Sequence, residues 1–507
     1  MALVTKLRAL YKLPFAVATS GIAATNFVDG MTAHSLLKIP IPILPDDTLR
    51  IALQSKLATA IRFAACIIWD ELPNTDNLNV LAADRSLRQI LRADTVFMGG
   101  KPLISAGDPR QIPPVIPNGT RADIGNHTIF NHQQIWGSMH LHALTRNMRV
   151  ENQGADAQFA TWLLQLGEGR LPAPNANITP QVPPDHIELP YRMCIDTTRA
   201  MGDLLTESPT EVSVDGLLQF VYPNMETRHL TDPVYFTDRL IVAPTLQAAA
   251  RINDELIARM PGQVREYASA DTVQDSDHNQ FYPSEFLNGL NCITGMPPHL
   301  LCLKIGMPVI LLRNLRPPGH CNGTRYVIHT MHDNSIMLRA ITGSTTGRLF
   351  NLPRIVNRPN TSDTHWTFVL RRVQFPIVPA FCISINKSQG QTVKRVGVYL
   401  PTPVFTHGQC YVASSRTGDP ADLKYWVPDE PQYRYPDGSR AYVIKNIVWP
   451  EILVAARNPH TQVTEFGADP IAAPAMPRAP PLGAPDPEGI YDSDTDASQP
   501  DDPMELD

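Results

Sequence analysis

The 507-residue chain has no apolar run that approaches the roughly 18 residues of a membrane-spanning helix. Its seven cysteines are an odd number without a C-x-x-C pair, so neither a disulfide framework nor a zinc site is expected. Cys66 and Cys382 lie inside apolar runs and are expected to be small core residues in a reducing compartment. The first apolar stretch is short and is interrupted by Lys6, Arg8 and Lys12, which argues against a secretory signal. The length allows two or three domains with proper cores.

The last part of the chain contains no basic residue. Residues 486–507 hold nine acidic residues, whereas the whole chain has a net charge of −6, so residues 1–485 carry a net charge of +3. A mildly basic body is compatible with nucleic acid as a partner. Ten prolines lie between Pro459 and Pro503, and such a segment buries too little apolar surface to offset its ordering entropy. We therefore predict a disordered acidic tail over 458–507, either simply solvated or bound by a protein partner.

Two acidic residues follow a predicted buried strand. The run 67–69 is apolar, and Asp70 and Glu71 come at its end, while a second short strand over 102–106 leads into Gly107-Asp108-Pro109-Arg110-Gln111. In a nucleotide-hydrolysing parallel sheet, such polar groups meet at one edge. Asp70 is then expected to hold Mg²⁺ through water, and Glu71 to orient and deprotonate the attacking water. An acidic pair after an apolar run can also be a helix N-terminus and nothing more.

The loop that would hold phosphates at such a site is absent from the sequence. No G-x-x-x-x-G-K-[ST] occurs in the 507 residues, although that loop supplies the phosphate cradle. Residues 3–11 have apolar and basic positions at helical spacing, and residues 13–18 are a short apolar run, which predicts a helix and then a strand. This helix stands about where the helix after a phosphate loop would stand. We therefore expect a strand and a loop ahead of Met1, with an ordinary amphipathic helix as the alternative.

Small polar residues follow the first predicted strand. Ser20 and Gly21 open a short helix, and Thr32 and His34 come soon after a turn at Gly30. Hydroxyls and N–H groups at a helix start suit a backbone phosphate. A simple capped helix explains Ser20 and Gly21 at least as well, and a lone histidine is more often a satisfied surface residue than a contact residue.

Three further stretches contain polar or cationic groups. Residues 380–392 read as a buried strand that breaks into a loop rich in Lys, Ser, Gln, Gly and Thr, which offers donors at several heights to a sugar-phosphate strand. Residues 409–416 form an apolar helical stripe that ends in Arg416, and residues 144–149 end in Arg149. Either guanidinium could cross a cleft to stabilise charge on a transferring phosphate, although Arg149 by itself would be a surface arginine.

The order and spacing of these motifs carry a family resemblance, from about Phe15 to Trp426. The chain resembles the superfamily-one 5′→3′ DNA helicases of the petite-integration-frequency (Pif-type) family, especially their Helitron-transposon relatives. Five stretches resemble the family's ATPase and DNA motifs: IIWDE at 67–71, GDPRQ at 107–111, LTRNMR at 144–149, INKSQGQT at 385–392 and YVASSR at 411–416. Three stretches resemble the family's inserted accessory domain: YPSEFLNGL at 282–290, LKIGMPVILLRNL at 303–315 and CNGTR at 321–325.

The resemblance implies an α/β fold with two RecA-like, P-loop-type domains and a small β-rich accessory domain inserted in the second. The expected first domain covers 1–160, and a Pro-rich linker follows at 161–184. The expected second domain is split between 185–275 and 372–450, around an insertion at 276–371. The alternating, turn-rich run from Gly306 through Arg358 favours a β-rich insertion on its own.

The resemblance also implies an ATP-dependent DNA helicase with ATP and Mg²⁺ as cofactors. Its partners would be single-stranded DNA and DNA duplex junctions, with no membrane involved. The implied nucleotide-site residues are Asp70, Glu71, Gln111, Arg149 and Arg416, with Gln111 as phosphate sensor and the arginines as fingers. The implied DNA-binding residues are Ser20, Gly21, Thr32, His34, Lys387, Ser388, Gln389, Gly390 and Thr392. Nuclear residence and a role in DNA repair, recombination, telomere maintenance or transposition follow as expectations from DNA work.

The chain departs from the family pattern at several positions. Pro109 stands where an aromatic residue is expected, Leu72 where an alanine is usual and Ser414 where a leucine is usual. None of these changes removes a charged catalytic group. Two other kinds of protein remain open: a catalytically dead single-stranded-DNA-binding remnant of a helicase, and an inert scaffold whose acidic tail recruits a partner.

Overall fold

A computed structural model of the chain describes residues 2–28, 30–144, 157–195, 213–229, 232, 234–274, 282–315, 319–359, 366, 368–457 and 464–465. Arg149 and nearly all of the predicted acidic tail lie outside these residues. No helix in the described ranges is long and apolar enough to cross a membrane. All seven cysteines are free thiols, and Cys66 and Cys382 are buried, as expected for core residues.

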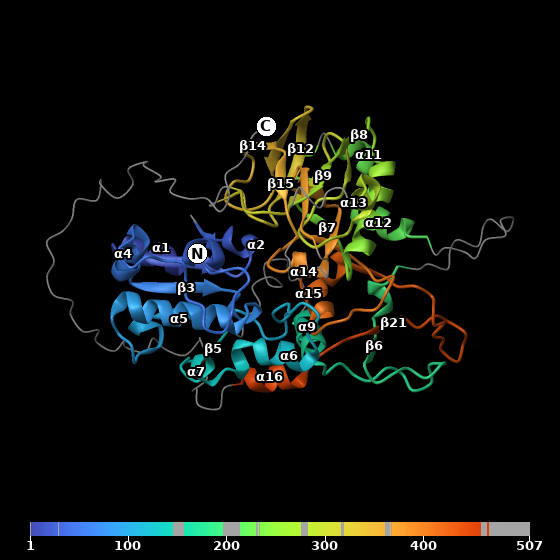
Figure 1. Ribbon diagram of the computed structural model, residues 1–507. Coiled ribbons are helices and arrows are strands. Elements are labelled where there is room, and N and C mark those ends of the chain that lie inside the picture. Colours follow the sequence, from blue (N-terminus) through green and yellow to red (C-terminus); the bar gives the residue numbers. More distant parts are fainter. Residues whose placement is uncertain are drawn as a thin grey trace. The chain divides into compact units, whose positions relative to one another are not determined.

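The N-terminal part of the chain forms a four-stranded parallel sheet (Figure 1). Its strands, in spatial order, are β2 (Met31–Thr32), β1 (Pro14–Ala18), β3 (Cys66–Asp70) and β4 (Leu103–Ser105). The register pairs Ala18 with Asp70, so the loop after β1 and the acidic pair after β3 share one edge of the sheet. This edge is the carboxyl end of both strands, because the strands are parallel.

Helices cover both faces of this first sheet because alternate strand residues point to opposite sides. Phe15, Val17, Ile67 and Trp69 pack into one apolar cluster with Leu87 of α5 (Asn77–Leu91). Ala18, Cys66 and Ile68 pack into another with Val4 of α1 (Ala2–Ala9). In Figure 1, α1 and α5 lie on opposite sides of β3. The remaining helices of this part are α2 (Gly21–Ala24), α3 (Ala33–Leu37), α4 (Lys56–Phe63), α6 (Arg121–His127) and α7 (Gln133–Trp136).

A second four-stranded parallel sheet is built from later segments. Its order is β18 (Cys382–Ser384), β7 (Arg239–Ala243), β19 (Arg395–Tyr399) and β20 (Leu423–Trp426). The same two-residue alternation sorts its strands: Leu240 and Val242 point into one apolar cluster, and Ile241 and Ala243 into the other. Its helices are α10 (Asp215–Val221), α11 (Met225–Arg228), α12 (Leu246–Arg259), α14 (Ile385–Ser388) and α15 (Gln409–Ser414).

An antiparallel, β-rich region interrupts the second sheet between α12 and β18. It holds a five-stranded sheet of β14 (Leu349–Pro353), β13 (Ser335–Ala340), β12 (Arg325–Met331), β11 (Pro308–Leu311) and β17 (Ile377–Pro379). A three-stranded sheet contains β15 (Ile355–Asn357), β16 (Leu370–Gln374) and β9 (Ala270–Val273). A two-stranded sheet pairs β10 (Leu300–Leu303) with β8 (Arg265–Ala268). The helix α13 (Ser284–Gly289) lies between β9 and β10 in the sequence. Its strands span 265–379, beyond both ends of the expected insertion at 276–371, because β8 and β9 pair only with strands of this region.

The expected linker also differs from the structure. The helix α9 (Ala157–Glu168) occupies its first eight residues and packs Phe159, Leu163 and Leu166 into a core of the second sheet. The apolar spacing of these residues outweighs the nearby prolines, which begin only at Pro172. After the second sheet, β21 (Val443–Lys445) pairs with β6 (His186–Glu188), and α16 (Pro450–Ala456) follows. A separate small unit pairs β5 (His142–Ala143) with β22 (Thr464–Glu465) in parallel.

Candidate functional site

Asp70 and Glu71 form a polar tip at the carboxyl end of β3. The N–H of Glu71 donates to Asp70 Oδ1 at 3.1 Å, and the second Asp70 oxygen accepts no hydrogen bond from a described residue. Glu71 has a φ of +55°, in the left-handed region that a non-glycine residue adopts at a cost. Thr19 holds this conformation, since its hydroxyl donates to the Glu71 carbonyl at 2.7 Å and accepts from Trp69 Nε1 at 3.1 Å. The segment after β1 therefore fixes the direction of the acidic pair.

Burial gives the two carboxyl groups unusual proton affinities. It raises the pKa of Asp70 above its ordinary value, although the Glu71 N–H opposes this change. Burial and the neighbouring Asp70 charge raise the pKa of Glu71 from 4.5 to about 7, while the Arg416 charge and the Asn74 amide lower it. Asn74 Nδ2 donates to Glu71 Oε2 at 3.0 Å. A carboxylate with a pKa near neutral pH is suited to take up a proton and release it again.

Gln111 lies at the end of the loop that follows β4 and contacts the second sheet. Its side-chain oxygen accepts a hydrogen bond from Gln389 Nε2 at 2.9 Å. The Gln111 NH₂ group and the Gln389 oxygen make no other hydrogen bond with a described residue, so both remain available to a ligand. The structure thus brings together one residue predicted for the nucleotide site and one predicted for the DNA site.

Arg416 is buried and its guanidinium is held by the protein. Nε donates to the Val412 carbonyl at 2.7 Å, and Nη1 donates to the carbonyls of Ser388 and Gln391 at 3.3 and 3.0 Å. Only 2 % of Arg416 is exposed. In this arrangement the arginine shapes the loop 388–391 and acts on Glu71 through its charge, whereas a direct phosphate contact would require it to leave these carbonyls.

Two predicted DNA-binding side chains are used inside the fold. Thr32 is buried and caps α3, with Oγ1 accepting from the Ser35 N–H at 3.3 Å. Ser388 is fully buried, and its hydroxyl donates to the Ile385 carbonyl at 2.7 Å. A contact of either hydroxyl with DNA is not available in this arrangement. The residue types alone gave no sign of this, because hydroxyls cap helices as readily as they bind phosphates.

Five other predicted DNA-binding residues comprise three polar side chains and two glycines. Ser20 is exposed and caps α2, and Thr392 is exposed too. His34 is half-buried, and burial lowers its pKa below the ordinary value of 6.5. The two glycines, Gly21 and Gly390, are sites of close backbone approach: a Cβ at Gly21 would come within 2.2 Å of the Asn322 carbonyl oxygen, and Gly390 has a φ of +80°.

Lys387 has the clearest electrostatic signature in the loop 385–392. Burial lowers the pKa of its ammonium from 10.5 to about 8. No hydrogen bond or ion pair joins its side chain to another described residue. A partly desolvated cation without a carboxylate partner attracts an anion.

The positions that depart from the family pattern are accommodated by the fold. Leu72 is fully buried. Ser414 donates its hydroxyl to the Cys410 carbonyl at 2.6 Å and contacts the Tyr425 hydroxyl, so the polar group is satisfied. The Pro109 carbonyl accepts from His407 Nε2 at 2.9 Å.

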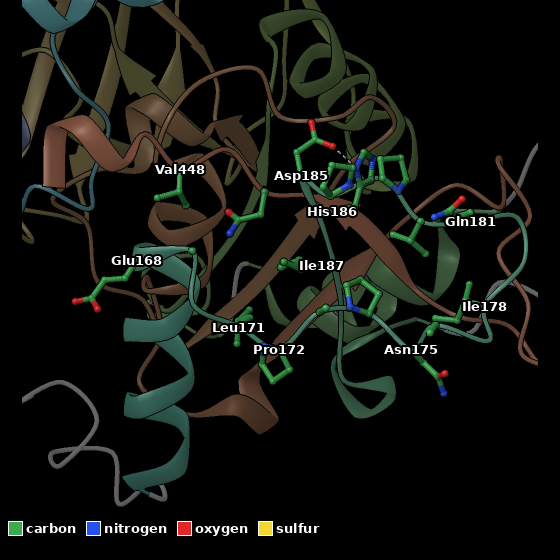
Figure 2. A pocket seen from close by; sticks show the side chains of 18 of the residues that line it. Glu168, Leu171, Pro172, Asn175, Ile178, Gln181, Asp185, His186, Ile187 and Val448 are labelled. Carbon is green, nitrogen blue, oxygen red and sulfur yellow. Dashed lines mark hydrogen bonds and ion pairs between the residues drawn. The ribbon is translucent and has the colours of Figure 1, made fainter. Parts of the chain in front are cut away.

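A cavity of about 1000 Å³ lies apart from these residues (Figure 2). It is lined by the proline-rich segment 168–187 together with Asn446, Val448 and Pro450, and by none of the predicted site residues. Asp185 and His186, which point toward one another in Figure 2, are joined by a hydrogen bond of 2.7 Å. Within the described residues, no three His, Cys, Asp or Glu side chains are grouped as a metal site.

Comparison with solved structures identifies the class of fold. The Pif1 helicase of Candida albicans superposes with a TM-score of 0.55 at 19 % identity, over 90 % of this chain and 91 % of that one. Bacteroides Pif1 bound to single-stranded DNA gives a TM-score of 0.54 at 20 % identity, over 83 % and 84 %. The fold is therefore that of the RecA-like helicases, and the predicted fold class is confirmed.

The sequence comparisons agree on the family. Residues 1–177 match the model of the PIF1-like helicases, and residues 285–331 match that of the DNA helicase Pif1 2B domain. The ATP-dependent DNA helicase PIF1 of Candida albicans is 23 % identical over 83 % of this chain, and that of Danio rerio 26 % identical over 80 %. These matches support a Pif1-type helicase, which the chain resembles in both sequence and fold. The chain spans about half the length of these two curated relatives, 50 % and 53 % respectively.

Proposed function

We propose that the chain forms the motor part of an ATP-dependent DNA helicase that moves 5′→3′ along single-stranded DNA. The observation that carries this proposal is Glu71, a strained, half-buried carboxyl group with a pKa of about 7 at the carboxyl edge of a parallel sheet. The proposal is supported by the family and by a solved Bacteroides Pif1 complex with ADP-AlF3 and single-stranded DNA, which matches at 20 % identity with a TM-score of 0.55.

The residues at this edge fit a nucleotide with Mg²⁺. Asp70 keeps one carboxylate oxygen without a hydrogen bond from a described residue and would hold the ion through water, with phosphate oxygens as its other ligands. Bound Mg²⁺ neutralises charge on the phosphates. Glu71 accepts the proton of the attacking water, and the NH₂ group of Gln111 donates to the terminal phosphate. Arg416, and Arg149 outside the described residues, would add positive charge.

The DNA path in this proposal crosses the tops of both sheets. Lys387 supplies a cation, and Gln389, Ser20, His34 and Thr392 supply neutral polar contacts to the backbone. Because Gln389 already bonds to Gln111, a change at the phosphate would reach the DNA-side loop through one amide pair. Duplex junctions would be met where the strand enters this path.

A second candidate function is single-stranded-DNA binding without hydrolysis. It is favoured by one observation: the 507 residues contain no phosphate-loop sequence, so they supply no cradle for the β- and γ-phosphates. In either case the chain should bind labelled oligonucleotides in fluorescence anisotropy, with an affinity that falls as salt rises. Binding that is undetectable or independent of salt would contradict both functions.

Hydrolysis separates the two candidates. The chain should be compared with a longer chain that has a strand, a Gly-rich loop and Lys-Ser/Thr placed ahead of Met1. The longer chain is expected to hydrolyse ATP in a DNA-stimulated way and to open forks with a 5′ tail in preference to a 3′ tail. Glu71→Gln should abolish turnover and retain ATP binding, because it removes the base and keeps the shape. The matched control is Glu285→Gln, an exposed change on α13.

Two results would overturn the enzyme proposal. A longer chain that folds and binds DNA but does not hydrolyse ATP would support the DNA-binding function instead. Brisk hydrolysis by the 507 residues alone would show that the site is wrongly assigned. Nuclear residence, a role in DNA maintenance and a protein partner for the acidic tail remain proposals, and imaging of a tagged chain tests the first.

A further inference from the structure

The loop 107–111 is shaped by the carboxylate of Asp108. Asp108 Oδ1 accepts from the N–H of Arg110 at 3.0 Å and from its Nη1 at 3.1 Å. The Asp108 carbonyl accepts from the N–H of Gln111 at 3.1 Å, which closes a tight turn. The direction in which the Gln111 side chain leaves the loop therefore depends on how this carboxylate is held.

The second oxygen of Asp108 is held from the other sheet. Tyr411, on α15, donates its hydroxyl to Asp108 Oδ2 at 2.7 Å. The two residues are 303 positions apart in the chain. Packing is close around this bond, since a Cβ at Gly167 would come within 2.8 Å of the Tyr411 ring, and one at Gly408 within 2.4 Å of the Arg110 carbonyl oxygen.

A second contact reinforces the same loop. Arg110 donates from Nε and Nη2 to Glu168 Oε1, at the end of α9, at 3.0 and 2.8 Å. This ion pair holds the loop against α9, whereas Tyr411 holds it against α15. The loop 107–111 is therefore bound to both α9 and α15, and its bond to α15 is a single hydroxyl hydrogen bond.

The helix that carries Tyr411 also leads to Arg416. Arg416 donates to the carbonyls of Ser388 and Gln391, so α15 is continuous with the residue that shapes the loop 388–391. A displacement of α15 would therefore act on two loops together: it would release Asp108 in the loop 107–111, and it would move Arg416 relative to the loop 388–391.

We propose that Tyr411 is a positioning residue that ties α15 to the loop 107–111 and so sets the position of Gln111. The hydroxyl-to-carboxylate bond is charge-assisted and half-buried, which makes it strong for a single contact. The consequence for nucleotide sensing rests on the proposed function, whereas the holding of the loop does not.

Hydrogen exchange of the 507-residue chain tests this role. Tyr411→Phe removes only the hydroxyl and keeps the ring against Gly167. The matched control is Tyr235→Phe, which removes a hydroxyl bonded to the Pro223 carbonyl at 3.0 Å rather than to the loop 107–111. Tyr411→Phe should speed amide exchange at Arg110 and Gln111 on the order of tenfold, and the control should leave these amides unchanged. Equal exchange in Tyr411→Phe and the unchanged chain would overturn the proposal, as would the same acceleration in both variants.

A DNA-dependent measurement separates positioning from a merely structural role. Addition of a single-stranded oligonucleotide should alter exchange at Gln111 in the unchanged chain and in Tyr235→Phe, through the Gln389–Gln111 pair. In Tyr411→Phe the loop already exchanges fast, and the oligonucleotide should no longer alter it. An undiminished response in Tyr411→Phe would overturn the proposal. If DNA alters Gln111 in no variant, the DNA side of the proposed function fails, and the comparison without DNA still decides the role of Tyr411.

Discussion

Glu71→Gln should change the pH dependence of stability in a way that the structure fixes in sign and size. The pKa of Glu71 rises from 4.5 to about 7 in the folded chain, because burial and Asp70 disfavour the ionised form. A raised pKa contributes stability that is fully present below pH 4.5 and is lost as the pH rises through 7. A glutamine side chain does not titrate, so the variant lacks this change.

The size of the effect follows from the two pKa values. Between pH 5 and pH 8, the contribution of Glu71 to the free energy of unfolding should fall by about 2.5 kcal/mol. Relative to the unchanged chain, Glu71→Gln should therefore gain about that amount of stability across this range. The variant keeps an acceptor for the Asn74 amide, so the comparison isolates the charge.

Urea unfolding at a series of pH values, followed by tryptophan fluorescence, measures this difference. Trp69 is a suitable reporter because it is fully buried next to the acidic pair. Glu285→Gln, the same substitution at an exposed position, serves as the control. A stability difference between Glu71→Gln and the unchanged chain that does not vary with pH, or that favours the variant more at pH 5, would refute the reasoning.

Three further changes have expected outcomes. Arg372→Met should lower the free energy of unfolding by about 3–5 kcal/mol, because it leaves the fully buried Asp271 side chain without its ion-pair partner at 2.7 Å. Calorimetry of the full chain measures this loss, and a value below about 1 kcal/mol would contradict the prediction. Ser388→Ala should lower the free energy of unfolding in urea by about 1 kcal/mol and leave the DNA affinity of the folded chain unchanged, because the Ser388 hydroxyl bonds inside the fold. A large loss of DNA affinity in the fully folded variant, measured by fluorescence anisotropy, would instead support a DNA contact by Ser388. His407 has a lowered pKa through burial, so its stabilising contribution is present above pH 6.5 and is lost as the pH falls; His407→Gln should flatten that decline in acid melting curves, and an unchanged decline would refute it.

The parallel sheets could be predicted because their strands are nearly continuous apolar runs. The run at 67–69 predicted β3, and the acidic residues after it predicted which edge carries the polar tip. The extent of the β-rich region was predicted less well. β8 and β9 are too short and too polar to be assigned to a sheet before their partners are known.

Contacts between distant segments set the limits of prediction at the site. The bond between Tyr411 and Asp108 follows from the packing of two sheets, and no local pattern encodes it. Likewise, hydroxyl residues such as Thr32 and Ser388 satisfy neighbouring backbone groups or face outward depending on the turn of a single helix. Residue types predicted which loops carry clustered polar groups, whereas the contacts of individual side chains needed the fold.

The return of α16 to the first sheet has a mechanical consequence. Ile452 and Ala456 pack into the core that contains β3. Arg121 of α6 donates two hydrogen bonds, each of 2.6 Å, to the carboxylate of Glu451. Because α16 follows the second sheet in the sequence, the chain returns from that sheet to the core of the first at Trp449. Any movement of one sheet relative to the other must therefore also be accommodated by the short segment between β21 and α16.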